Sequence, residues 1–233
     1  MKKKLMLIMS MIFIILILFP KTNSYGFNNK DIISDIICFS KGDVKESGLK
    51  INFKESSGLE YCDKKLISIE SYYNETFKRT VIKNQDFYCL EFASDSISGY
   101  IEYIYETNTY SLKIESKDKK YGIQELKKSI FNIMNDKSEI TSYYTYVKAR
   151  IFNEDIDKLN RGIIEYCKSR SAENIESISI GNGYSTVMNI EDENLKNQKA
   201  YDNGKKINLN YALCSYKSGD YLIIGSPIIE ITY

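Results

Sequence analysis

The residues best suited to do chemistry lie on the segment 141–151, where two kinds of side chain alternate. On an extended strand, Tyr144, Tyr146, Lys148 and Arg150 share one side, and the residues between them are mostly apolar. Two aromatic rings followed by two cations suit recognition of an extended polymer or a partner protein, because Tyr and Arg combine contact area with hydrogen bonding. An ordinary solvent-facing strand would give the same pattern.

Three further polar residues would share that side if the two halves of the chain align. The candidate binding residues are therefore Tyr144, Tyr146, Lys148, Arg150, Lys113, Asn208 and Asn210. All of them are predicted to lie on a sheet face that helices leave uncovered.

Catalysis has little support, because the chain contains no histidine. Ser-His-Asp and Cys-His nucleophile systems and His-ligated metals are thereby excluded. Paired carboxylates remain open, but Glu191, Asp192 and Glu193 lie in a polar run typical of a solvated loop. The stretch Gly181-Asn182-Gly183 lacks the Lys-Ser/Thr ending of a phosphate loop and favours a turn. We expect no catalytic residues, no metal and no cofactor.

The N-terminus predicts export. Three lysines at positions 2–4 precede Leu5–Pro20, an uncharged apolar run of a length between that of a signal h-region and a spanning helix. Small residues at 22 and 24 would allow a cut before Tyr25. Residues 1–24 are thus a cleaved signal peptide or an uncleaved membrane anchor. Either places the rest of the chain outside the cytoplasm, with the membrane contacted only through this segment.

Charge argues against nucleic-acid binding. The leader carries Lys2, Lys3, Lys4 and Lys21, four of the 32 basic residues. Its removal leaves 28 basic against 31 acidic residues, a net charge of −3. Phosphate neutralisation dominates nucleic-acid affinity, so a binder of DNA or RNA normally carries a basic excess.

Hydrophobic periodicity predicts the elements that would position the candidate residues. The order helix, strand, helix, three strands occurs twice. The first set is helix 31–40, strand 49–53, helix 59–73 and strands 86–92, 99–105 and 110–115. The second set is helix 122–135, strand 141–151, helix 154–168 and strands 177–180, 207–216 and 221–233. We therefore expect an α+β fold of two similar halves, 25–120 and 121–233. Its mainly antiparallel, curved sheet would carry helices on one face.

Local signals predict how two of these helices begin. Ser57 and Glu60 match a capping box ahead of helix 59–73. Asn153 is the predicted N-cap of helix 154–168, and acidic residues follow it in the first turn, as the helix dipole favours.

The cysteines number five, at positions 38, 62, 89, 167 and 214, with no CxxC pair. Several fall within apolar periodic runs, which favours small buried hydrophobes. Outside the cytoplasm one disulfide bond can form, and the odd count leaves at least one thiol free.

The C-terminal stretch 207–233 (INLNYALCSYKSGDYLIIGSPIIEITY) resembles the end of the YwmB family of bacterial proteins. The match comprises a strand of the NLNYAL type, a hairpin, the run Gly225-Ser226-Pro227-Ile228-Ile229 and a final Tyr233. Gly183-Tyr184-Ser185 resembles a further short motif of that family. The resemblance implies a fold similar to the TATA-box binding protein, a duplicated α+β saddle. It implies no established activity and no catalytic residues, since a fold does not carry a function with it.

The sequence thus predicts an extracytoplasmic binding or interaction module of the bacterial cell envelope. Its partner would be an envelope protein or polymer. The alternative is a carboxylate-dependent hydrolase acting on an envelope polymer.

Overall fold

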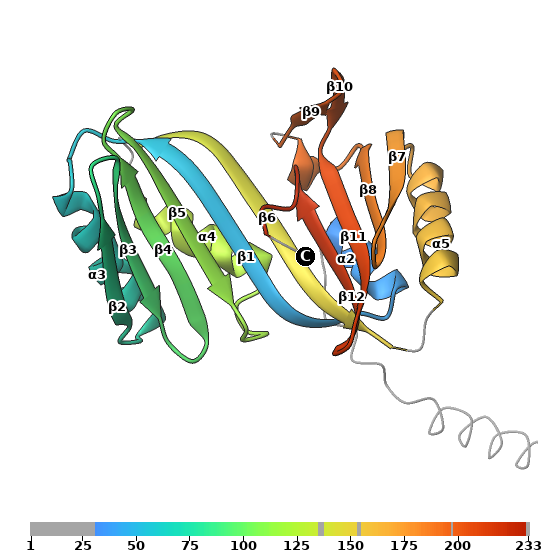
Figure 1. Ribbon diagram of the computed structural model, residues 1–233, viewed down its shortest axis with the longest axis horizontal. Helices are drawn as coiled ribbons and strands as arrows, with labels where there is room; N and C mark the ends of the chain where they lie inside the picture. The colour runs from blue at the N-terminus through green and yellow to red at the C-terminus, as the bar shows by residue number, and fades with distance from the viewer. Residues whose placement is uncertain (1–30, 135–137, 153–154, 197, 232–233) are drawn as a thin grey trace, which may run out of the picture. The chain divides into compact units, whose positions relative to one another are not determined.

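The computed structural model describes residues 31–134, 138–152, 155–196 and 198–231 (Figure 1). The predicted leader, residues 1–24, lies outside the described residues. Ile32–Tyr233 forms one compact unit. Its described residues have the predicted α+β class, with ten strands in one antiparallel sheet and two more in a separate hairpin. No helix within the described ranges is long and apolar enough to span a membrane.

The helices follow the apolar stripes of the sequence. They are α2 (Ile32–Phe39), α3 (Glu60–Tyr73), α4 (Ile123–Ile133) and α5 (Ile156–Ser169), with a short 3-10 helix, η1 (Glu193–Leu195). The strands of the first half are β1 (Asp43–Lys54), β2 (Lys78–Lys83), β3 (Phe87–Ala93), β4 (Ile97–Ile104) and β5 (Thr109–Ser116). Those of the second half are β6 (Glu139–Ile151), β7 (Glu173–Ile180), β8 (Gly183–Asn189), β9 (Ala200–Asp202), β10 (Lys205–Ile207), β11 (Leu209–Tyr216) and β12 (Gly219–Ser226).

The strand order of the large sheet is β2-β3-β4-β5-β1-β6-β12-β11-β8-β7. The long strands β1 and β6 lie side by side at its centre (Figure 1) and pair from Asp43 opposite Arg150 to Lys54 opposite Glu139. The predicted boundary between residues 120 and 121 falls between β5 and α4. Both halves therefore contribute to one continuous sheet.

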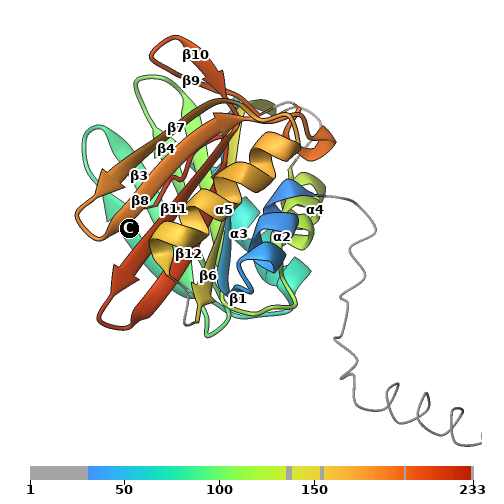
Figure 2. The same ribbon diagram turned by 90° about the vertical axis from the view of Figure 1, so that its right-hand side faces the viewer.

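Helices α2 to α5 pack on one side of this sheet, which we call the helix face (Figure 2). Strand alternation decides which side chains meet them: on β5, Tyr110, Leu112 and Ile114 are buried there, as their spacing predicts. One core cluster packs α3 and α4 on the first half, and a second packs α2 and α5 on the second half. We call the opposite side of the sheet the open face.

Each half contains a meander of four strands in the sheet, where the sequence predicts three. The missed strand of the first half, β2, is exposed throughout and has no apolar alternation, because it is an edge strand. The missed strand of the second half, β8, starts at a glycine and mixes small and polar residues. Period-two patterns are weak in both, so sequence periodicity does not detect them.

Both predicted helix caps are wrong in their detail. Leu59 is the N-cap of α3 and makes no side-chain cap bond, while Ser57 donates to the Glu55 carboxylate instead. The cap of α5 is Asp155, whose carboxylate accepts from the Lys158 backbone N–H at 3.0 Å. Asn153 lies outside the described residues. In the first case the Glu55 carboxylate holds the Ser57 hydroxyl away from the helix, and in the second Asp155, next to Ile156, takes the cap position.

All five cysteines fall within the described residues, and none forms a disulfide. Cys62, Cys89, Cys167 and Cys214 are buried, as predicted for small hydrophobes, and Cys38 is exposed. Burial raises the pKa of the Cys62 and Cys167 thiols to about 12.

The C-terminal segment leaves the sheet after Ser226. Pro227 has no backbone N–H and cannot continue a strand ladder. The residues after it lie over the open face: the Ile229 side chain lies against Gly225, and Glu230 reaches Lys50 on β1 at 2.9 Å. The predicted strand 221–233 is therefore shorter, and its end becomes a strap on the sheet.

Candidate functional site

The open face of the first half is the part of the sheet that carries accessible polar side chains. On β5, Lys113 and Glu115 point to this face because their neighbours point to the helices. The same alternation assigns Lys50 of β1, Tyr100 of β4 and Tyr144 of β6 to it. Helices α2 to α5 lie on the other side of the sheet (Figure 2).

The strand registers bring six of these residues into one line across the sheet. Adjacent strands place them directly opposite one another, in the order Thr80, Glu91, Tyr100, Lys113, Lys50 and Tyr144. We call this line the polar row. Cross-strand neighbours have β-carbons about 5 Å apart, so a ligand lying along the row would meet each side chain in turn.

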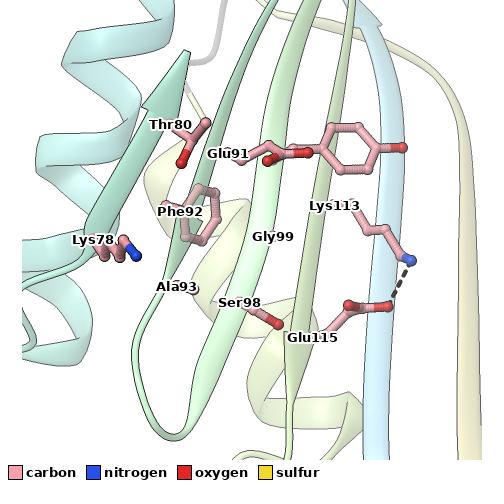
Figure 3. Close-up of a pocket in the computed structure, with 10 residues that line it drawn as sticks. Lys78, Thr80, Glu91, Phe92, Ala93, Ser98, Gly99, Lys113 and Glu115 are labelled. Carbon is pink, nitrogen blue, oxygen red and sulfur yellow. Dashed lines mark ion pairs between the residues drawn. The ribbon is translucent and has the colours of Figure 1, made fainter. Parts of the chain in front are cut away.

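A hollow of about 380 Å³ opens beside the polar row over β2 to β5 (Figure 3). The sheet surface is lowest where the small side chains of Ala93 and Ser98 line the hollow. Lys78 lies at one end, and the ion pair between Lys113 and Glu115, 2.6 Å long, lies at the other. We call it the sheet hollow. Its lining offers both charges, hydroxyls and an aromatic ring, and thus suits a polar ligand rather than a purely anionic one.

Lys50 links the polar row to the C-terminal strap. Its Nζ lies 2.9 Å from Glu230 and 5.9 Å from the centre of the Tyr144 ring. Burial would lower the pKa of Lys50, but the hydrogen bond that Lys50 donates to Glu230 and the nearby charges outweigh it and raise that pKa. Lys50 is therefore a fixed cation in the middle of the row.

Tyr146 forms a second cluster at the centre of the sheet. Its hydroxyl lies 2.6 Å from Glu46 and 2.5 Å from Glu115, and the Lys113 ammonium lies 5.9 Å from its ring. Burial, followed by the hydrogen bonds to both carboxylates, raises the pKa of Tyr146 well above its usual range. A phenol that stays protonated can donate but cannot act as a nucleophile.

The seven predicted binding residues divide into four groups. Tyr144 and Lys113 lie on the open face as predicted and belong to the polar row. Tyr146 points to the same face but is only 3% exposed, so it supports the surface from below.

The two cations of β6 lie farther along the sheet and face neighbouring rings. Lys148 lies over Tyr221 at 5.1 Å, and Arg150 lies over Phe152 at 5.1 Å. The Arg150 Nε is buried without a hydrogen bond among the described residues. The structure therefore does not join Lys148 and Arg150 to the sheet hollow.

Asn208 and Asn210 are buried and bond to the backbone. The Asn208 amide bonds both the N–H and the C=O of Ile190, at 2.9 and 2.8 Å. Asn210 donates to the Thr186 carbonyl and accepts from the Ile229 N–H. Their amides hold strands and the C-terminal strap, which leaves them no free group for a ligand.

Sequence reasoning missed Lys50, Tyr100, Glu91, Thr80 and Lys78. Lys50 and Tyr100 lie within predicted strands, and alternation alone would have assigned them to the open face. Thr80 and Lys78 lie on the undetected edge strand. Which of these residues line up depends on strand registers, and no sequence feature specifies those directly.

The predicted carboxylate and glycine motifs serve local structure. Asp192 caps η1 and accepts from the Ile32 N–H at 3.0 Å, and Glu193 is exposed beside Lys196. Gly181 and Asn182 form the turn between β7 and β8. No group of three or more His, Cys, Asp or Glu side chains suited to a metal ion occurs in the described parts of the chain.

Comparison of the sequence with protein families and with curated proteins gives no match.

Proposed function

We propose that the chain is a non-catalytic binding module of the bacterial cell envelope, and that the polar row and the sheet hollow form its ligand surface. The ligand class that fits is an extended polar polymer, because the row crosses six strands with alternating hydroxyl, carboxylate, ring and ammonium groups. A chain of sugar units presents hydroxyls and apolar ring faces at regular intervals and suits such a surface.

The observation that carries this proposal is the difference between the two halves of the open face. In the second half, Ala212, Cys214 and Ile223 point to this side yet are fully buried. In the first half, Thr80 and Glu91 are exposed, and Tyr100, Lys113 and Lys50 are half-buried. On the first half the polar side chains thus form an uninterrupted line, whereas on the second half these buried apolar residues separate Lys148 and Tyr221 from Ser185.

The location outside the cytoplasm rests on the N-terminal sequence. Three lysines and the apolar run Leu5–Pro20 are typical of a leader or anchor. We propose that the module is secreted or is held on the outer side of the cytoplasmic membrane.

We further propose that the fold is an internal duplication of the saddle type seen in the TATA-box binding protein, in line with the resemblance to the YwmB family. Strand order supports this: β2-β3-β4-β5-β1 in one half corresponds to β7-β8-β11-β12-β6 in the other. A helix precedes and follows the central strand in both halves. The β9–β10 hairpin is an insertion in the second half.

Despite this fold resemblance, we propose that the module binds no nucleic acid. A minor-groove saddle needs a basic surface. The lysines of the first-half open face, Lys50, Lys78 and Lys113, are accompanied by the carboxylates of Glu91, Glu115 and Glu230.

For the alternative of a carboxylate-dependent hydrolase, the pair of acids found close together in the described site is Glu46 and Glu115. Both bond the Tyr146 hydroxyl, which fills the space between them. Hydrolysis would need the scissile bond in that position. The geometry thus favours a supporting role for this pair.

The test is co-sedimentation of the full chain, in a mild detergent, with purified cell-wall glycan. We expect binding that weakens at least tenfold in the double variant Tyr100→Ala/Tyr144→Ala, because both rings belong to the polar row. The matched control is Tyr201→Ala/Lys206→Ala on the β9–β10 hairpin, which also removes an exposed ring and leaves the row intact.

Circular dichroism and thermal melting check that both variants fold. Equal sedimentation of the double variant and the control would refute the proposed surface. Release of products from the glycan by the wild type, lost in Glu115→Gln, would favour the hydrolase instead.

A further inference from the structure

A second candidate site lies where the central strand β6 loses one of its two neighbours. β1 pairs with β6 along almost its whole length, from Glu139 to Arg150. β12 pairs with it only from Ile151 back to Thr145, opposite Ser226. Among the described residues, the segment from Glu139 to Tyr144 has no strand on its β12 side.

Pro227 is the reason that the ladder ends there. It follows Ser226 directly, it has no N–H to donate, and the chain then turns onto the open face. In an antiparallel strand, successive residues point their N–H and C=O groups to opposite sides. About half of the backbone groups of Glu139–Tyr144 therefore face an unpaired edge, which is roughly 20 Å long at 3.4 Å per residue.

A hollow of about 410 Å³ runs along this edge. Its lining consists of Phe131, Ile140, Thr141, Ser142, Tyr143, Tyr144, Gln198, Lys199 and Pro227. We call it the edge slot. Phe131 at its mouth is 48% exposed, and its ring lies 6.4 Å from that of Tyr143. The mouth thus offers an apolar surface beside the strand edge, and the exposed Lys199 supplies a cation.

Gln198 lines the edge slot with a buried side-chain amide. Its side chain is only 2% exposed, yet neither its Oε1 nor its Nε2 makes a well-formed hydrogen bond within the described residues. The Tyr143 hydroxyl lies near it, but without the geometry of a full bond. A buried amide with neither bond formed costs free energy, because water can no longer satisfy it. The amide therefore has a donor and an acceptor available at the wall of the edge slot.

We propose that the edge slot binds an extended peptide segment of a partner protein, which adds to β6 as a short strand in line with β12. A peptide backbone presents an N–H and a C=O at each residue. It can therefore pair with the β6 edge on one side and satisfy the Gln198 amide on the other. An apolar side chain of the peptide would contact Phe131 and Ile140, and an acidic one would lie near Lys199.

This site is separate from the polar row, although Tyr144 borders both. The row presents side chains on the open face, whereas the edge slot presents backbone groups at a strand edge. The ligand classes differ accordingly, and Tyr100→Ala/Lys113→Ala and Gln198→Leu each change residues of one site alone.

The test begins with a library of random linear heptapeptides displayed on phage and selected on the full chain in a mild detergent. The best peptide is then synthesised, and its Kd is measured by fluorescence anisotropy. Gln198→Leu keeps the size of the side chain and removes both polar groups, and we expect it to weaken binding at least tenfold. Gln124→Leu, at an exposed position on α4, is the matched control and should leave Kd unchanged.

Methylated peptides test the strand geometry directly. N-methylation at every second backbone position in the register that faces β6 should abolish binding, while methylation in the alternate register, with the amide that meets Gln198 left unmethylated, should leave Kd within about threefold. Hydrogen exchange of the amides of residues 140–144 should slow at the same time. The double variant Tyr100→Ala/Lys113→Ala, in the polar row, should bind the peptide like the wild type.

Three results would overturn the proposal. The first is equal affinity for the wild type and Gln198→Leu while both fold. The second is equal loss from methylation in both registers. The third is a chain that selects no peptide until residues 232–233 are deleted, which would make its own C-terminus the occupant.

Discussion

The ring of Tyr146 lies directly across Gly48, so that a β-carbon on Gly48 would fall 2.1 Å from Tyr146 Cε1. The two residues are cross-strand partners on the central strands β1 and β6. Because Gly48 has no side chain, the Tyr146 ring can pass over β1 and reach Glu115 on β5. Three strands from both halves of the chain are thereby joined by one side chain.

Replacing Gly48 should therefore be costly. Gly48→Ala forces the Tyr146 ring off β1, and overpacking of this kind costs about 1–3 kcal/mol of unfolding free energy. Gly181→Ala is the matched control, since nothing lies within 4 Å of its β-carbon position. Urea denaturation measures both. In the background Tyr146→Ala the cost of Gly48→Ala should shrink, because the clashing ring is gone. An undiminished cost would locate the strain elsewhere.

Removing only the Tyr146 hydroxyl tests the carboxylate cluster. Tyr146→Phe keeps the ring over Gly48 but leaves Glu46 and Glu115 without their shared donor. We expect a loss of about 1–3 kcal/mol in urea denaturation. Tyr184→Phe removes a phenol–carboxylate bond to Asp157 at the surface and should cost less than about 0.5 kcal/mol. Similar losses in the two variants would mean that the buried cluster is no stronger than the surface bond.

Asn208 should matter for stability rather than for binding. Asn208→Ala leaves both backbone groups of Ile190 buried without partners, for which we expect a loss of about 3 kcal/mol. Asn132→Ala, at an exposed position on α4, should change stability by less than about 0.5 kcal/mol. The comparison is made by thermal and urea unfolding. A stable Asn208→Ala variant with impaired glycan binding would show instead that Asn208 contributes to ligand binding.

One thiol should react in the folded protein. Cys38 is exposed, whereas the other four cysteines are buried and burial raises the pKa of each of their thiols. A thiol reagent at pH 8 should modify one cysteine in the native chain and five in urea, counted by mass spectrometry. Cys38→Ser should abolish the native reaction. Rapid labelling of a second site would reveal local opening around that cysteine.

Alkaline pH should destabilise the fold through buried tyrosines. Burial raises the pKa of Tyr73 from 10.0 to about 12, and its hydroxyl lies 2.6 Å from Ser129. Above pH 10 the unfolded state loses this proton before the folded state does. Tyr73 therefore contributes stability that is complete below pH 10 and declines as pH rises toward 12. Urea denaturation at pH 8 and pH 11 should show a smaller decline in Tyr73→Phe than in the wild type.

Strand faces could be predicted from sequence wherever alternation is regular. The segments Tyr110–Glu115 and Tyr143–Arg150 have the two-residue period of half-buried strands, and the structure confirms their inward and outward sides. The exposed edge strand β2 has no such period, because neither of its faces is buried. Its residues Lys78 and Thr80 could not be assigned to a site without it.

The candidate site depends on pairings between distant strands, and these were beyond the sequence. Alternation alone assigns Tyr146 to the surface, and its burial follows only from its cross-strand pairing with Gly48. The sequence gives no sign that the Asn210 amide is occupied, but the Ile229 N–H of the strap after Pro227 donates to it. No sequence pattern predicts a role for Gln198, because its burial depends on how the chain packs around β6.

The central position of β1 has a consequence for the order of folding. Among the described strands β1 comes first along the chain, and β5 can cover one of its edges as soon as the first half folds. Its other edge must wait for β6, which follows α4 in the second half. During that interval a twelve-residue edge is open to pairing with another unfolded chain. Correct assembly therefore requires β6 of the same chain to reach this edge first.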